Sequence, residues 1–153
     1  MSHSLRSFKK EDAAGVKTLI LNILASEYPF DKSAYSDSDL DRISETYGGS
    51  KDAFFVIEED GEIVGTVGVK EEAKESALLR RLFVDLKHRK RGYGRELIAQ
   101  AMKFCKEKGY GKIYFRCTDR MKDAMALCVK NGFKESESLE VGGFKIHKLE
   151  FNC

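Results

Sequence analysis

Two long segments carry apolar residues at helical spacing, so each predicts an amphipathic helix. In the first, Asp12 is placed to cap a helix that Tyr28-Pro29-Phe30 ends. The apolar stripe of this helix comprises Val16, Leu19, Ile20, Ile23 and Leu24. The second helix follows Gly92 and ends at Lys108-Gly109, a basic last turn before a glycine. The apolar stripe of the second helix comprises Leu97, Ile98, Ala101, Phe104 and Cys105.

Two shorter helices are predicted from their boundary residues. Residues 38–47 begin with Ser38, and Asp41 stands three residues on, which resembles a capping box. A pair of glycines follows this segment and stops it. Residues 122–130 form the other short helix, which Asn131-Gly132 ends.

Short apolar runs between turn signals predict the strands. Asp60-Gly61 is a hairpin signal between two of these runs, and Gly142-Gly143 separates the last two. The predicted strands cover residues 5–8, 53–58, 62–69, 77–84, 113–117, 133–135 and 144–151.

The order of elements is therefore β-α-α-β-β-β-α-β-α-β-β. Helices inserted among strands that mostly follow one another predict an α/β (α+β) fold with a mixed sheet covered on both faces. No internal repeat, low-complexity tract or linker interrupts the chain. We expect one domain over residues 1–153.

Composition supports a globular protein and excludes a general polyanion binder. The 153 residues are 42% hydrophobic and 34% charged, and the net charge is only +2. The charges are unevenly placed. Residues 80–95 hold seven basic side chains and one acid, whereas residues 27–45 hold six acids and two basic side chains. The first segment suits an anionic cofactor, and the second suits a cationic acceptor.

The cysteines show neither a CxxC pair nor zinc-ligand spacing, so no metal site is expected. They are Cys105, Cys117, Cys128 and Cys153, and three of them fall within predicted elements, as buried free thiols often do. The first ten residues have no apolar signal core, and the longest apolar run is too short to span a bilayer. These features predict a reduced, cytoplasmic compartment and no membrane partner.

The segment with the clearest chemistry runs from an apolar strand, Leu82-Phe83-Val84, into the basic loop Arg89-Lys90-Arg91 and then Gly92-Tyr93-Gly94-Arg95. Free N–H groups at the start of a helix bind anions, and the helix dipole adds to that attraction. Glycines let the backbone approach a diphosphate closely. A tight turn or a solvated basic patch are the alternative interpretations of the same residues.

The order Arg-x-x-Gly-x-Gly after an apolar strand resembles the coenzyme A pyrophosphate loop of the GCN5-related N-acetyltransferases, the GNAT family. The hairpin at residues 60–66 and the segment Ala124 to Phe133, which is similar to the family's Ala-x-x-Leu-Tyr-x-x-x-Gly-Phe, support the resemblance. It covers nearly the whole chain. It implies a mixed, mostly antiparallel sheet of about seven strands with about four helices on its two faces.

The resemblance implies acetyl transfer from acetyl-CoA to an amine. Its implied cofactor-binding residues are Leu82, Phe83, Val84, Arg89, Lys90, Arg91, Gly92, Tyr93, Gly94 and Arg95. Backbone N–H groups from Arg91 to Arg95 would hold the pyrophosphate, and the basic side chains would add charge. The N–H of Val84 would face the thioester oxygen and stabilise the negative charge that develops there.

Two positions depart from the family pattern. Leu78 stands where many relatives carry a glutamate base, and Glu62, Glu72 and Glu75 are weak substitutes because surface acids are usually solvated. Cys128 stands where the family usually has a tyrosine acid. Either Cys128 protonates the leaving thiolate or it is a small buried hydrophobe.

Two alternatives to an N-acetyltransferase follow. One is an acyl-CoA-binding module of the same fold with weak or lost catalysis. The other is a nucleic-acid-binding protein, which the confinement of basic residues to one loop disfavours. The sequence does not identify the acceptor amine, although the acids of residues 27–45 suggest a cationic one, and a homodimer is compatible with the family.

Overall fold

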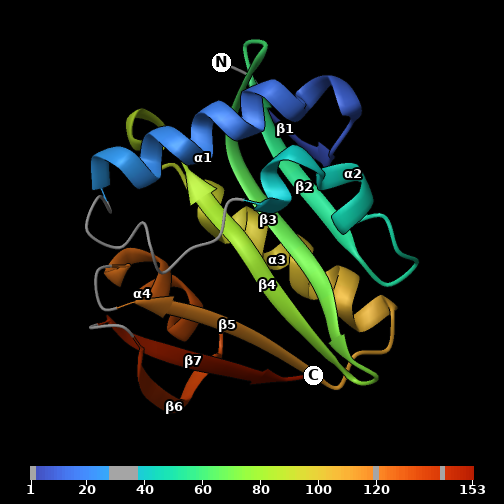
Figure 1. The fold of residues 1–153 in the computed structure, drawn as a ribbon, viewed down its shortest axis with the longest axis vertical. Coiled ribbons are helices and arrows are strands. Elements are labelled where there is room, and N and C mark those ends of the chain that lie inside the picture. The colour runs from blue at the N-terminus through green and yellow to red at the C-terminus, as the bar shows by residue number, and fades with distance from the viewer. Residues whose placement is uncertain (1–2, 28–37, 119–120, 142–143) are drawn as a thin grey trace.

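The fold consists of one twisted sheet with helices against it (Figure 1). The computed structural model describes residues 3–27, 38–118, 121–141 and 144–153. Its strands are β1 (His3–Ser7), β2 (Ala53–Glu59), β3 (Glu62–Ala73), β4 (Ser76–Val84), β5 (Lys112–Thr118), β6 (Lys134–Val141) and β7 (Phe144–Asn152). Its α-helices are α1 (Ala13–Glu27), α2 (Ile43–Thr46), α3 (Tyr93–Glu107) and α4 (Lys122–Lys130), and its 3-10 turns are η1 (Lys10–Asp12), η3 (Ser38–Asp41) and η4 (Leu86–His88). None of the helices in these ranges is both long and apolar enough to cross a membrane.

The sheet has seven strands in the order β1-β2-β3-β4-β5-β7-β6. The pair β4–β5 is parallel, and the other neighbouring pairs are antiparallel. Helices α1 and α2 lie over one face, and α3 lies behind the sheet in Figure 1. The predicted mixed, mostly antiparallel sheet with helices on both faces is confirmed.

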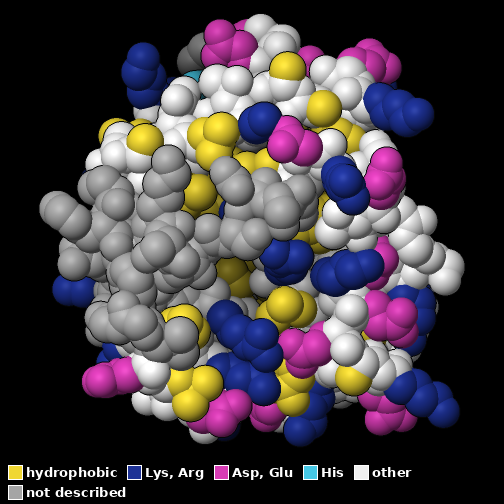
Figure 2. Space-filling view, viewed as in Figure 1, with side chains coloured by type: hydrophobic (Ala, Val, Ile, Leu, Met, Phe, Trp, Pro, Cys, Tyr) yellow, Lys and Arg dark blue, Asp and Glu magenta, His cyan; other side chains and the backbone are white. Residues whose placement is uncertain are grey.

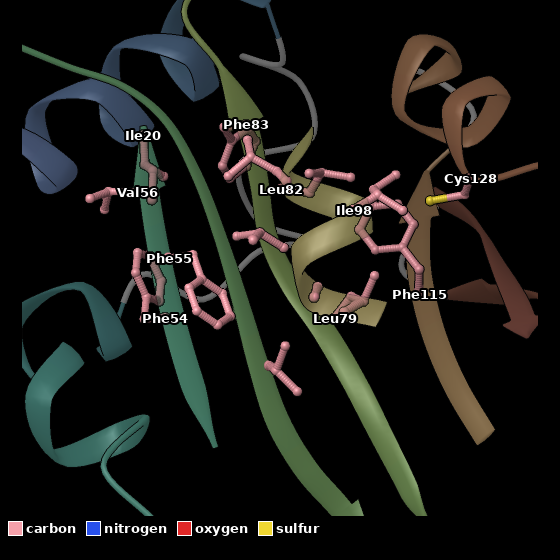
Figure 3. Packing of buried hydrophobic residues seen from close by; sticks show 14 of the residues in the cluster. Ile20, Phe54, Phe55, Val56, Leu79, Leu82, Phe83, Ile98, Phe115 and Cys128 are labelled. Carbon is pink, nitrogen blue, oxygen red and sulfur yellow. The ribbon is translucent and has the colours of Figure 1, made fainter. Parts of the chain in front are cut away.

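The two predicted apolar stripes bury themselves against the sheet. Every residue of the α1 stripe is buried, and so are Leu97, Ile98, Ala101 and Cys105 of α3. Phe104 is only half-buried and packs edge-on against Phe55 of β2, with 6.0 Å between ring centroids. Figure 3 shows Ile98 of α3 beside Leu79 of β4 and Phe115 of β5. This core fixes where the first turn of α3 stands relative to β4.

The single helix predicted over residues 38–47 is wrong. The chain instead forms η3 and then the short α2, with a break at Arg42, whose φ is −139° and ψ 39°. The break allows Leu40 and Ile43 to be buried together. A ten-residue helix is marginal by itself, so this burial decides the backbone path.

The predicted strand over residues 133–135 is too short, because β6 runs from Lys134 to Val141. This strand lies at the edge of the sheet and is rich in serine and glutamate, which have low strand propensity. Its pairing with β7, and not its own apolar pattern, makes it a strand.

Strands β4 and β5 diverge at one end. Their described pairing joins Ser76–Leu79 of β4 to Lys112–Phe115 of β5, after which both strands continue apart (Figure 1). At that point β4 carries a bulge, where Arg81 has a φ of 54°. The buried hydroxyl of Thr66 donates a hydrogen bond to the Arg81 carbonyl at 2.7 Å and holds the bulge. The resulting opening is where the two cavities of the site meet.

Candidate functional site

Two cavities share the opening between β4 and β5. The larger, about 610 Å³, lies between the end of β4, the basic loop and α4, and we call it the loop cavity. The smaller, about 410 Å³, lies between the diverging strands themselves, and we call it the cleft cavity. Both are lined by Leu82, Phe83 and Met121, so a ligand reaching along β4 would pass from one to the other.

All predicted cofactor-binding residues except Arg91 line the loop cavity. They are Leu82, Phe83, Val84, Arg89, Lys90, Gly92, Tyr93, Gly94 and Arg95. The opposite wall comes from α4 and its surroundings, with Met121, Asp123, Ala124, Leu127, Lys130 and Asn131. The structure therefore brings the strand and the loop together on one cavity, which sequence spacing alone could only suggest.

The start of α3 offers backbone donors to this cavity. Gly92 caps the helix in the left-handed conformation, with a φ of 82°. The first helical hydrogen bond joins the Glu96 N–H to the Gly92 carbonyl at 3.0 Å, so the preceding N–H groups of Tyr93, Gly94 and Arg95 have no acceptor within the helix. Such groups, with the helix dipole, form an anion-binding site.

Gly94 also allows α3 and α4 to approach closely. A Cβ at this position would lie 2.6 Å from a terminal methyl carbon of Leu127 on α4. A side chain here would therefore require the Leu127 side chain, which lines the loop cavity, to move.

Side-chain charge in the loop cavity is mainly positive. Its described lining holds Arg89, Lys90, Arg95 and Lys130 against one acid, Asp123. An anionic ligand of the size of a nucleoside diphosphate derivative would be attracted there.

The side chain of Arg91 takes a different place from the one predicted. Its guanidinium lies 3.1 Å from the carboxylate of Glu59 at the end of β2. The same carboxylate accepts a hydrogen bond from the Tyr93 hydroxyl and lies 3.0 Å from the His88 ring. The other ring nitrogen of His88 lies 2.6 Å from Asp85. The Arg91 side chain therefore pairs with Glu59 and is not among the residues that line the loop cavity.

The sequence analysis did not single out Glu59, the carboxylate on which these contacts converge. Its side chain is buried, and the hydrogen bond from Tyr93, helped by the charge of Arg91, holds the pKa of the carboxyl below its usual value. The same hydrogen bond raises the pKa of Tyr93. Next to Asp60-Gly61, Glu59 resembles an ordinary exposed hairpin residue, so no local signal marks it.

The N–H of Val84 points into the opening between the strands. The Asp85 N–H donates to the Val64 carbonyl at 2.8 Å, and donors alternate in direction along an antiparallel strand. The preceding N–H, that of Val84, is therefore directed away from β3. The Val84 carbonyl accepts a hydrogen bond from Arg89 at 3.0 Å, which ties the strand end to the loop.

Cys128 lies in the core and lines neither cavity. Its side chain is fully buried, and its sulfur points toward Phe115 (Figure 3). Loss of solvation raises the pKa of the thiol to about 12. A thiol this weakly acidic would be a poor proton donor to a thiolate whose conjugate acid has a pKa of about 8.5. Both observations favour the packing interpretation.

The position of the family base is apolar in the structure too. Leu78 lines the cleft cavity, whereas Glu62, Glu72 and Glu75 line neither cavity. Glu72 instead contacts Arg116 at 3.2 Å.

Most of the acidic segment predicted to attract a cationic acceptor lies outside the described residues. This holds for Asp31 and Asp37, and for the side chains of Glu27 and Asp39. Asp41 is described, and its carboxylate contacts Lys17 at 2.6 Å on the surface.

Comparisons with known proteins agree with this geometry. Residues 18–133 match the model of the acetyltransferase (GNAT) family. The chain is 30% identical over 129 residues to N-acetyltransferase family 8 member 3 of Rattus norvegicus, covering 78% of this chain and 56% of that one. It is 30% identical over 105 residues to N-acetyltransferase 8 of Homo sapiens, covering 65% of this chain and 46% of that one. The chain thus spans about half the length of these relatives.

Solved structures share the fold at lower identity. A GNAT-family acetyltransferase from Staphylococcus aureus Mu50 superposes with a TM-score of 0.87 at 22% identity, covering 99% of both chains. The PaiA N-acetyltransferase of Thermoplasma acidophilum, solved in complex with coenzyme A, gives a TM-score of 0.76 at 21% identity and covers 100% of both chains. The family match over most of the chain, the seven-stranded sheet and the loop cavity lead to one conclusion: the chain belongs to the GNAT family of acetyltransferases.

Proposed function

We propose that this protein is an N-acetyltransferase that transfers the acetyl group of acetyl-CoA to an amine. The observation that carries the proposal is the junction of the two cavities at Leu82 and Phe83. The loop cavity suits the anionic cofactor, and the cleft cavity gives an acceptor access to the same stretch of β4. The names of the relatives and the coenzyme A complex of the Thermoplasma protein support this assignment.

The residues present fit coenzyme A. The N–H groups of Tyr93, Gly94 and Arg95 would hold the pyrophosphate, and Arg89 and Lys90 would add charge that solvent partly screens. The pantetheine amides would pair with outward-facing backbone groups at the end of β4. Bound acetyl-CoA supplies an activated acetyl group as a thioester.

The N–H of Val84 would stabilise the negative charge that develops on the thioester oxygen. A single preorganised donor of this kind contributes on the order of 3 kcal/mol to lowering a barrier. The acceptor nitrogen forms a bond to the acetyl carbon, the carbon–sulfur bond breaks, and the electron pair leaves on the sulfur of coenzyme A. The products are an N-acetylated amine and coenzyme A, and the proton lost by the nitrogen balances the one that the thiolate gains.

A free alkyl amine with a pKa of about 10.4 is neutral in only about one part in a thousand at pH 7. None of the described residues lining the cleft cavity is a carboxylate that could take its proton. We therefore propose that water accepts this proton and that solvent, not Cys128, returns one to the thiolate.

The second candidate function is an acyl-CoA-binding module without turnover. Leu78 at the place of the base and the burial of Cys128 favour it.

The test is a panel of amines incubated with acetyl-CoA, read by release of free thiol and by the mass of the acetylated product. Turnover with any amine supports the proposed function, provided that acetyl-CoA remains intact in the control without amine. Tight coenzyme A binding with no turnover across small amines, amino acids, polyamines and peptide N-termini would favour the binding module.

A further inference from the structure

The charged side chains of the cleft cavity are of one sign. Its described lining contains three arginines, Arg80, Arg81 and Arg116. It contains no lysine, histidine, aspartate or glutamate among the described residues. The rest of that lining is mainly apolar, including Leu78, Leu82 and other hydrophobic residues. Figure 2 shows several Lys and Arg side chains, with Asp and Glu side chains among them, over the part of this face where β4, β5 and β7 lie in Figure 1.

Arg81 is the most buried of the three, since only 7% of the residue is exposed. It also stands at the bulge of β4 with a positive φ, which is uncommon for a residue other than glycine. At the bulge, held by the Thr66 hydrogen bond to its carbonyl, Arg81 lines the cavity beside Leu82.

Arg116 borders the cavity from the opposite strand. It stands on β5 beyond the last residue paired with β4, where the strands have separated. Its side chain is half exposed and contacts Glu72 at 3.2 Å. A guanidinium carries five N–H donors, so each of these arginines can bind a ligand oxygen in addition to its contacts within the protein.

We infer that the acceptor amine carries a carboxylate, which the cleft-cavity arginines bind, next to an apolar group that packs on the leucines. This inference rests on the proposed function and names its substrate class: a small apolar amino acid or a close analogue. Guanidinium and carboxylate match as planar, two-point partners, and such charged hydrogen bonds are stronger than neutral ones.

The same positive charge would reduce the need for a protein base at the position of Leu78. Nearby cations disfavour the ammonium form of an amine and lower its pKa. A larger fraction of the bound acceptor is then neutral and ready to attack, so less is required of a protein base. Pairing its carboxylate with the arginines would hold the acceptor nearby at the same time.

The test compares apolar amino acids, such as phenylalanine and leucine, with their α-carboxamides. Binding to the coenzyme A complex is measured by calorimetry, and turnover is measured separately by thiol release. We expect the free acids to bind at least about tenfold more tightly than the amides, the ratio that about 1.4 kcal/mol of charge pairing gives. Equal or tighter binding of the amides, or no binding of any acid, overturns the inference.

Three variants locate the interaction. Arg116→Gln should reduce the acid-to-amide ratio several-fold and leave coenzyme A affinity unchanged. Glu72→Gln breaks the same ion pair but keeps the guanidinium, so it should keep the ratio. Lys112→Gln removes a cation from the other end of β5 and should also keep it. If either control variant reproduces the effect of Arg116→Gln, the arginine does not bind the acceptor.

The two readouts separate the two proposals. Preference for acids in binding without any turnover supports the carboxylate site and contradicts the proposed function. Turnover of amines that lack a carboxylate, together with no preference in binding, supports the function and overturns the carboxylate site.

Discussion

The hydroxyl of Tyr93, in the first turn of α3, donates a hydrogen bond to the buried carboxylate of Glu59 at the end of β2. The two residues are 34 positions apart in sequence. Arg91 and His88 contact the same carboxylate from the basic loop. One buried acid thus ties the loop and the start of α3 to the end of β2.

Glu59→Gln should weaken the anchoring of the basic loop, although Glu59 itself lines neither cavity. We expect the KM for acetyl-CoA to rise about tenfold, the effect of losing one good charged interaction, with the KM for the acceptor nearly unchanged. Tyr93→Phe should show a smaller change in the same direction. Steady-state kinetics with each substrate varied in turn measures both, and Glu62→Gln, an exposed acid on β3, is the control. A rise in the acceptor KM alone would show that Glu59 acts elsewhere.

Coenzyme A should stabilise the folded protein, because the loop cavity exists only in the folded chain. At about 100 times its dissociation constant the ligand should add about 2.7 kcal/mol to the free energy of unfolding. Denaturation followed with and without coenzyme A measures the gain. An unchanged unfolding curve at saturating ligand would exclude the loop cavity as its site.

Gly92→Ala and Gly109→Ala form a matched pair. Both glycines have a positive φ, 82° and 80°, so an alanine at either should cost about 1–2 kcal/mol of stability. Only Gly92 borders the loop cavity, so only Gly92→Ala should weaken coenzyme A binding as well. Calorimetric titration of both variants checks this, and equal affinities would place the pyrophosphate away from α3.

Cys128→Ala should cost about 1–2 kcal/mol of stability through a small cavity in the core and leave kcat unchanged. Cys153→Ala, at an exposed position, should change stability by less than about 0.5 kcal/mol. Turnover and chemical denaturation measured on the same preparations decide the matter. A loss of kcat at full stability would restore Cys128 as the acid.

Asp12 should make stability depend on pH in acid. Its carboxylate accepts hydrogen bonds from Arg6 and from the Lys9 N–H, and the bond from Arg6 lowers the pKa of Asp12 below its ordinary value of 3.8. The folded state therefore binds this proton less readily than the unfolded state does. The stabilisation is present above pH 3.8 and is lost as the pH falls below it toward the lower folded pKa.

Asp12→Asn should consequently be less stable at pH 7 by about 1 kcal/mol, because it gives up a charged hydrogen bond. Its free energy of unfolding should also fall less steeply below pH 3.8 than that of the parent protein. Denaturant titrations at several pH values measure both effects. Parallel pH profiles for the two proteins would contradict the role given to Asp12.

The sequence by itself determined the succession of elements and the position of the basic, glycine-containing loop before α3. Apolar stripes, hairpin signals and glycine stops each involve residues close together in sequence, so local backbone preferences are enough to predict them. The loop from Arg89 to Arg95 was predictable for the same reason, since a helix start and its glycines lie in one short segment. The resemblance to the family then supplied the topology.

Only the tertiary structure decided which side chains meet. Three features depend on segments far apart in the chain. They are the contact of Arg91 with Glu59, the burial of Cys128, and the position of Arg81 and Arg116 on one cavity. The short helix pair around Arg42 and the length of β6 were also decided by packing and pairing with other strands. Local propensities are weak beside the free energy of burying apolar residues in a shared core, so long-range packing settles these positions.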